Sequence, residues 1–78
     1  MVDRAEQFLI EMGFIEERVR IHNNLARIEV PAADIPRIAA DEIRSRIYEE
    51  FRKIGFMYIS LDLKGYRTGS MNETLAQK

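Results

Sequence analysis

Charged residues occupy alternate positions in two short segments, and they are the part of the chain best suited to bind an anion. The first segment carries Arg18, Arg20 and His22, and the second carries Arg27 and Glu29. Successive side chains of a β-strand point to opposite faces, so each set shares one face if the segments are strands. Guanidinium groups match the oxygen atoms of phosphate or carboxylate in a bidentate way. The spacing therefore predicts a polar surface on which such an anion could bind.

Only Asn23 and Asn24 separate the two segments, which predicts how the residues face each other. Asparagine tolerates a positive φ, so the pair can form a two-residue hairpin turn. The predicted register pairs Arg18 with Glu29, Val19 with Ile28, Arg20 with Arg27, Ile21 with Ala26 and His22 with Leu25. Two arginines opposite each other destabilise a sheet by up to about 1 kcal/mol unless something negative lies between them.

A second interpretation of these residues needs no ligand. Arg18 with Glu29 and Arg27 with Asp62 could form exposed ion pairs, each worth roughly 0 to 1 kcal/mol. Glu29 and Asp62 could also flank a hard cation, although two carboxylates without a third ligand more often serve as partners of arginines. Spacing alone leaves these alternatives open, and it does not fix whether a metal binds.

Independent catalysis is not indicated. His22 is the only histidine and the chain has no cysteine, so a metal ligand set, an orienting acid–base pair and a thiolate nucleophile are missing. No Ser-His-Asp order and no dinucleotide fingerprint occurs either. We therefore expect the chain to bind, position or assemble something for a partner.

The composition predicts one small folded domain, residues 1–78. Of its residues 46% are apolar and 32% charged, which is typical of a globular chain, and the net charge of -1 gives no overall attraction to nucleic acid. No long apolar run follows the charged N-terminus, so we expect no membrane segment. The lack of cysteine suits a reducing compartment, and the cytoplasm is the expected location.

Apolar periodicity predicts an α+β fold of order α-β-β-α-β, with two main helices on one face of a three-stranded sheet. The first helix runs from Val2 to Met12, and the second carries Ile43, Ile47, Phe51 and Ile54. Each helix ends in Gly-Phe, within FLIEMGF and EFRKIGF, where glycine can take a positive φ. A short helical turn follows Pro31. The strands are 18–22, 25–30 and 57–63, with Ile59, Leu61 and Leu63 inward and Tyr58, Ser60 and Asp62 beside the arginines.

The segment after Leu63 has no apolar period and is expected to be a loop. Gly65-Tyr66-Arg67-Thr68-Gly69-Ser70 is similar in composition to a phosphate-wrapping loop, but it lacks the Gly-Lys-Ser/Thr of a nucleotide loop. Because of this similarity in composition, Arg67 is added to the candidate phosphate ligands. Ser70 and Glu73 could form a capping box for a final short turn.

Three segments together resemble the C-terminal domain of the LarE-type ATP-dependent sacrificial sulfur transferases, which belong to the PP-loop ATP pyrophosphatase superfamily and help build a nickel-pincer nucleotide cofactor. The segments are Arg18-Val19-Arg20 with Leu25-Ala26-Arg27-Ile28-Glu29-Val30-Pro31, then Gly55-Phe56-Met57-Tyr58-Ile59-Ser60-Leu61-Asp62-Leu63, then Gly65-Tyr66-Arg67-Thr68-Gly69-Ser70-Met71-Asn72. The resemblance covers nearly the whole chain. Asn23-Asn24 departs from the Gly-Asp expected at the turn.

The resemblance implies a partner, namely an N-terminal PP-loop domain or subunit that binds ATP and Mg and activates a substrate carboxylate. Sulfur then comes from a cysteine or an iron–sulfur cluster of such proteins. Neither the PP-loop nor a cysteine is present here. The chain is thus expected to act as an accessory domain, as a fragment or as a separate subunit, and to bind no cofactor alone.

By position, the resemblance implies that Arg18 and Arg20 bind the phosphate of a nucleotide-like substrate. Glu29 would be an acid near that site, and Glu6 on the first helix matches a further family acid. The alternative function is a small oligomerisation or protein-interaction module without a ligand, in which an exposed strand edge or the Tyr58 face docks another subunit.

Overall fold

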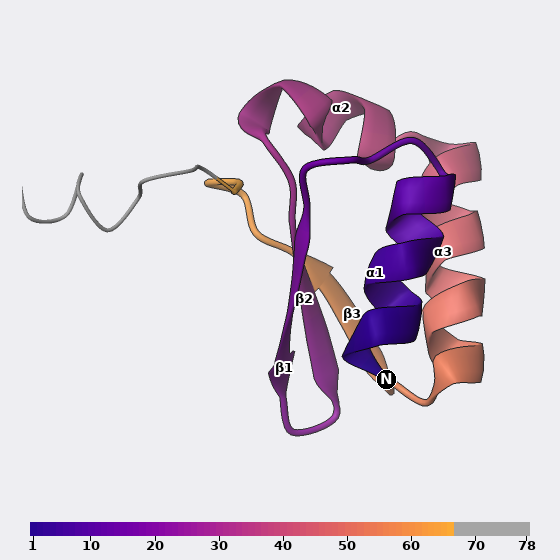
Figure 1. Ribbon diagram of the computed structural model, residues 1–78. Helices are drawn as coiled ribbons and strands as arrows, with labels where there is room; N and C mark the ends of the chain where they lie inside the picture. Colours follow the sequence, from indigo (N-terminus) through magenta and orange to yellow (C-terminus); the bar gives the residue numbers. More distant parts are fainter. Residues whose placement is uncertain (67–78) are drawn as a thin grey trace, which may run out of the picture.

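The structure, a computed structural model, describes residues 1–66 and consists of one helical layer packed on one sheet (Figure 1). Its elements are α1 (Val2–Glu11), β1 (Arg18–His22), β2 (Leu25–Glu29), a 3-10 turn η1 (Ala32–Asp34), α2 (Ile35–Ile38), α3 (Asp41–Ile54) and β3 (Tyr58–Leu61). The predicted α+β class and the order of the main elements are confirmed. None of the helices in this described part is long and apolar enough to cross a membrane.

The sheet has the strand order β1-β2-β3, with β2 in the centre. β1 and β2 are antiparallel, and their register is the predicted one, from Arg18 opposite Glu29 to His22 opposite Leu25. Asn23 has a φ of 54°, the left-handed conformation that the turn requires. β3 is parallel to β2, so α3 forms the crossover between them.

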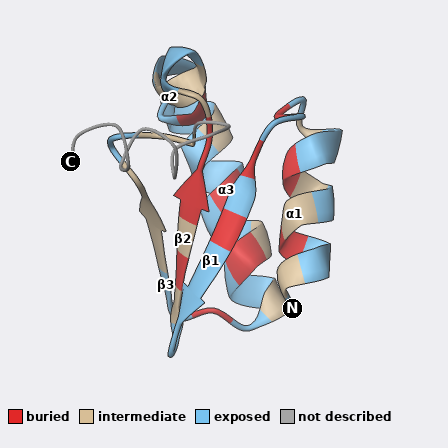
Figure 2. Ribbon diagram, turned by 60° about the vertical axis from the view of Figure 1, so that its left-hand side comes forward, coloured by how far each residue is buried: buried red, intermediate tan, exposed pale blue. Residues whose placement is uncertain are grey.

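The two long helices cover one face of the sheet, and the core lies between the layers (Figures 1 and 2). The buried apolar residues are Ala5, Leu9, Phe14, Val19, Ala26, Ile28, Val30, Ile38, Ile47, Phe51 and Phe56. They come from every main element except β3, where Ile59 and Leu61 are partly buried and pack against this core. The stripes predicted from three- and four-residue spacing thus meet in one cluster.

Both Gly-Phe sequences end their helices in the same way. Gly13 has a φ of 101° and Gly55 a φ of 130°. The Phe14 N–H donates to the Leu9 carbonyl at 2.9 Å, and the Phe56 N–H donates to the Phe51 carbonyl at 3.1 Å. These six-residue closures bury each phenylalanine immediately after its helix, which confirms the repeated helix-to-strand unit.

One residue predicted to point inward is exposed, and one apolar residue of β1 is less buried than Val19. Leu63 is 83% exposed, because β3 ends at Leu61 and the strand alternation stops there. Ile21 alternates with Val19 as predicted but is 43% exposed. The hairpin end of β1 extends past the helical layer, so no helix covers it (Figure 1).

Candidate functional site

The face of the sheet without helices carries the arginine face, which we define as Arg18, Arg20, Arg27, Glu29 and Asp62. β1 supplies the first two residues, β2 the next two, and Asp62 follows β3. Three guanidinium groups and two carboxylates leave this face with a formal charge of +1. A locally positive surface therefore exists within a chain whose net charge is -1.

Glu29 lies between the two arginines that face each other. Its side chain is only 11% exposed, and its carboxylate accepts from Arg20 Nε at 3.3 Å and from Arg27 Nη2 at 3.1 Å. The predicted like-charge pair is thus relieved by an acid of the protein itself. Arg20 uses its Nε for this bond, and its side chain remains 48% exposed.

The ion pairs predicted without a ligand are confirmed only in part. Arg27 Nε lies 3.6 Å from Asp62 Oδ2, as predicted, although this buried nitrogen has no hydrogen-bond partner among the described residues. Arg18 is not seen to pair with Glu29. Its guanidinium lies 5.6 Å from the centre of the Tyr66 ring, and its Nη1 donates to the Glu17 carbonyl at 3.4 Å. Tyr66, rather than an acid, orients Arg18.

Glu6 is not on the arginine face. It lies on α1, and its Oε2 accepts the backbone N–H of Val19 at 3.0 Å, on the open edge of β1. This acid therefore joins the first helix to the strand that carries Arg18 and Arg20, and it is separated from Glu29 by the sheet.

Glu17 is a titratable residue that the sequence reasoning missed. It is 6% exposed, and its Oε1 has no hydrogen-bond partner among the described residues. Burial, and then the charge of Glu6, raise the pKa of Glu17 to about 7, against an opposing effect of Arg18. A signal was available, because Glu17 has the same parity as the inward Val19 and so continues the helix-facing side of the strand.

The other candidate residues do not assemble into a further site. His22 and Tyr58 are exposed, and Ser60 is half-buried. Arg67 lies outside the described residues, as do Ser70 and Glu73. Within residues 1–66, no group of three or more His, Asp or Glu side chains is placed to hold a metal ion. Glu29 and Asp62, the possible cation pair, both contact arginines instead.

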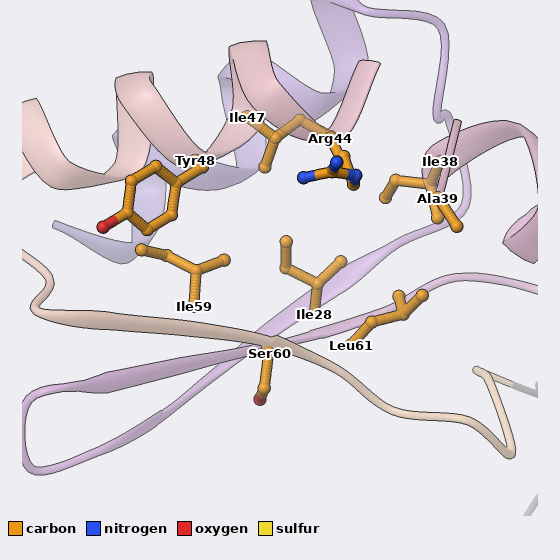
Figure 3. Close-up of a pocket in the computed structure, with 9 residues that line it drawn as sticks. All are labelled: Ile28, Ile38, Ala39, Arg44, Ile47, Tyr48, Ile59, Ser60 and Leu61. Carbon is orange, nitrogen blue, oxygen red and sulfur yellow. The ribbon is translucent and has the colours of Figure 1, made fainter. Parts of the chain in front are cut away.

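A separate apolar pocket of about 320 Å³ lies on the helical side of the sheet, between α3 and β3 (Figure 3). Its lining includes Ile28, Ile38, Ile47, Ile59 and Leu61, with Arg44 and Tyr48 from α3. Figure 3 shows Ile59 and Ile28 directed towards the helix and Ser60 directed away from it. The pocket and the arginine face are therefore on opposite sides of the sheet.

The fold and this surface define a small α+β domain with a helix-backed sheet and an arginine and carboxylate face. No protein-family model matches the sequence. Over 73 residues, 94% of the chain, it is 42% identical to pyridinium-3,5-bisthiocarboxylic acid mononucleotide synthase of Lactiplantibacillus plantarum. Over 76 residues, 97% of the chain, it is 40% identical to the uncharacterized protein slr1717 of Synechocystis sp..

These matches confirm the resemblance predicted from the sequence: over nearly its whole length the chain is similar to a LarE-type protein. It spans 26% and 28% of the length of the two relatives, so it corresponds to about a quarter of each. The matched residues include the whole of the hairpin and β3 that carry the arginine face.

Proposed function

We propose that this chain is the substrate-binding and assembly domain of a PP-loop ATP-dependent sulfur transferase that acts in nickel-pincer cofactor biosynthesis. In this proposal it corresponds to the C-terminal domain and has no complete catalytic activity alone. The name of the Lactiplantibacillus plantarum relative, a synthase of a pyridinium mononucleotide, supports a mononucleotide as the ligand.

The observation that carries the proposal is the placement of Arg18 and Arg20. They are two residues apart on β1, so their Cα atoms are about 7 Å apart on one face of the sheet. Both are exposed, and neither is covered by a helix. Two guanidinium groups at this separation can donate to different oxygens of one phosphate.

Their neighbours hold these arginines in place before a ligand arrives. Glu29 accepts a hydrogen bond from Arg20 Nε, so the terminal nitrogens of Arg20 remain available as donors to a ligand. Tyr66 supports the Arg18 guanidinium through a cation–π contact, with 5.6 Å between the guanidinium carbon and the ring centre. Arg27, held by Glu29 and Asp62, adds positive charge at the centre of the face. Such preorganisation reduces the side-chain entropy lost on binding.

The chemistry of activation belongs to a partner in this proposal. ATP and Mg are assigned to the PP-loop domain or subunit that the resemblance implies. That partner would supply the adenylation and the sulfur. The arginine face would hold the phosphate end of the substrate and thereby fix the distance of its reacting carboxylate from the activating site.

The test is an amide-shift titration of the chain with a mononucleotide and with pyrophosphate. We expect saturable shifts centred on β1 and β2, abolished by Arg18→Ala combined with Arg20→Ala. A matched control removes two exposed cations of α3, Arg46→Ala with Lys53→Ala, and should leave binding intact. An equal loss of binding in both double variants would show that only the overall charge of the chain matters, and it would reject the proposed site.

A further inference from the structure

The two edges of the sheet are protected differently. At the β1 edge, the Val19 N–H that points away from β2 is bonded by Glu6. This strand also carries Arg18, Arg20 and His22, all exposed. Charged side chains and a covered amide are devices that keep a strand edge from pairing with another chain.

The β3 edge lacks these devices among the described residues. Tyr58 N–H donates to the Asn24 carbonyl at 3.1 Å, and Asp62 N–H donates to the Ile28 carbonyl at 2.9 Å. Since amides alternate in direction along a strand, those of Ile59 and Leu61 point to the open edge. β3 carries no charge within Tyr58–Leu61, and the exposed Met57 precedes it.

An apolar surface accompanies this open edge. Ile59 and Leu61 are only partly buried, and they line the pocket beneath α3 (Figure 3). Tyr48, at the rim of the pocket, is 48% exposed. Outward amides and apolar side chains thus occur at the same edge, which is the combination that strand addition uses.

We propose that two copies of this chain pair through β3 in an antiparallel manner and form a continuous six-stranded sheet. In an antiparallel pair, side chains that are directly opposite each other lie on the same face of the sheet. In a symmetric pair of identical strands this holds only if the two-fold axis passes through a residue, because the helix-facing residues of one copy then lie opposite helix-facing residues of the other. An axis through Ser60 places Ile59 opposite the second copy's Leu61. Both residues have amides that point to the open edge, so this register forms backbone hydrogen bonds between the two copies. Both residues also line the pocket, so the same contact closes it.

A second copy is the favoured occupant because this register is self-complementary. On the other face it places Tyr58 opposite the second copy's Asp62, a hydroxyl donor opposite a carboxylate acceptor. A two-fold contact presents the same surface twice, so one unprotected edge is sufficient for a closed dimer. The β1 edge stays outside the contact, and Arg18 and Arg20 remain accessible on both copies.

Cysteine cross-linking tests the register directly. The chain has no cysteine, and Ser60→Cys would place two thiols at the axis. Opposite Cα atoms in such a non-hydrogen-bonded pair are about 4.5 Å apart, within the range for a disulfide. We expect Ser60→Cys to form a disulfide-linked dimer under mild oxidation, while Ser45→Cys, exposed on α3, stays largely monomeric. Equal cross-linking of the two variants would overturn the proposal.

Sedimentation equilibrium tests the association without cross-links. The weight-average mass should rise from 9.1 kDa towards twice this value as the concentration approaches about 1 mM. Leu61→Pro, which removes an outward amide, should keep the chain monomeric, while Ile21→Pro at the β1 edge should not. If a proline variant fails to fold, the same comparison can be made with Leu63→Asp, next to β3, and Ile15→Asp as its control. Both side chains are exposed, 83% and 78%, so neither substitution buries a charge in the core. A strict monomer at every concentration would refute the dimer.

Discussion

Glu17 is a buried carboxyl group that directly precedes β1 and is affected by the charge of Glu6 on α1. Burial and the charge of Glu6 raise its pKa to about 7 from 4.5. A carboxyl with a higher pKa in the folded state binds its proton more tightly there, so the stability that it contributes is complete below pH 4.5. That stability is lost as the pH rises through about 7.

The chain should therefore be less stable at pH 8 than at pH 4.5, by at most about 3 kcal/mol from this one group. Glu17→Gln keeps the shape without the charge and should remove most of this difference. Chemical denaturation at both pH values measures it. An unchanged pH dependence in Glu17→Gln would show that Glu17 ionises as an ordinary surface acid.

Glu29 accepts hydrogen bonds from two arginines, and its removal separates two interpretations of the arginine face. We expect Glu29→Ala to lower the free energy of unfolding by about 1 to 3 kcal/mol, because Arg20 would lose its acid partner and Arg27, directly opposite it, would keep only Asp62. It should also weaken binding of a mononucleotide, since Arg20 is no longer oriented.

The control for Glu29→Ala is Asp41→Ala, which removes an exposed acid paired with Arg44 and should change little. Denaturation and ligand titration give the two readouts. If phosphate binding became tighter in Glu29→Ala, then Glu29 would compete with the ligand instead of positioning Arg20, and the preorganised site would be wrong.

At the scale of the elements, the ends of the helices and the hairpin register follow from short sequence signals. Gly-Phe after each helix and Asn23-Asn24 between the strands determined the local backbone, and these predictions are confirmed. The exposure of Ile21 and Leu63 was not predictable in the same way. It depends on how far the helical layer extends over the sheet and on where β3 stops, which are properties of the assembled layers.

The same limit explains the candidate site. Alternation placed Arg18, Arg20, Arg27 and Glu29 on one face correctly. The partners were only partly predicted, because Arg20 reaches diagonally to Glu29 and Arg18 reaches Tyr66, which follows β3. Long side chains can contact diagonal neighbours as well as those directly opposite, so register alone does not assign ion pairs.

Gly55 tests the helix-end argument. A methyl group at this position would lie 3.4 Å from Met1 Cε, an ordinary contact, so the cost of substitution comes from the φ of 130°. We expect Gly55→Ala to lower the free energy of unfolding by about 1 to 2 kcal/mol and Gly55→Asn by less, because asparagine tolerates positive φ better. Thermal or chemical denaturation gives the order, and an alanine variant as stable as the parent would contradict it.

At the scale of the molecule, the two candidate surfaces found within residues 1–66 lie on opposite sides of one sheet. The arginine face lies on the uncovered side and the apolar pocket on the helical side, while the β3 edge borders both. Ligand binding should therefore respond to substitution of Arg18 and Arg20, and self-association to substitution of Leu61, whereas Asp62 belongs to both surfaces. This separation is suited to a domain that both holds a substrate phosphate and assembles with other chains.

The most direct measurement is the amide-shift titration of the unmodified chain with a mononucleotide and, in parallel, with the nucleoside that lacks its phosphate. Binding through Arg18 and Arg20 predicts saturable shifts in β1 with the mononucleotide, weakened by added salt, and no such shifts with the nucleoside. Equal responses to both compounds, or none at ligand concentrations of about 1 mM and above, would contradict phosphate recognition by the arginine face.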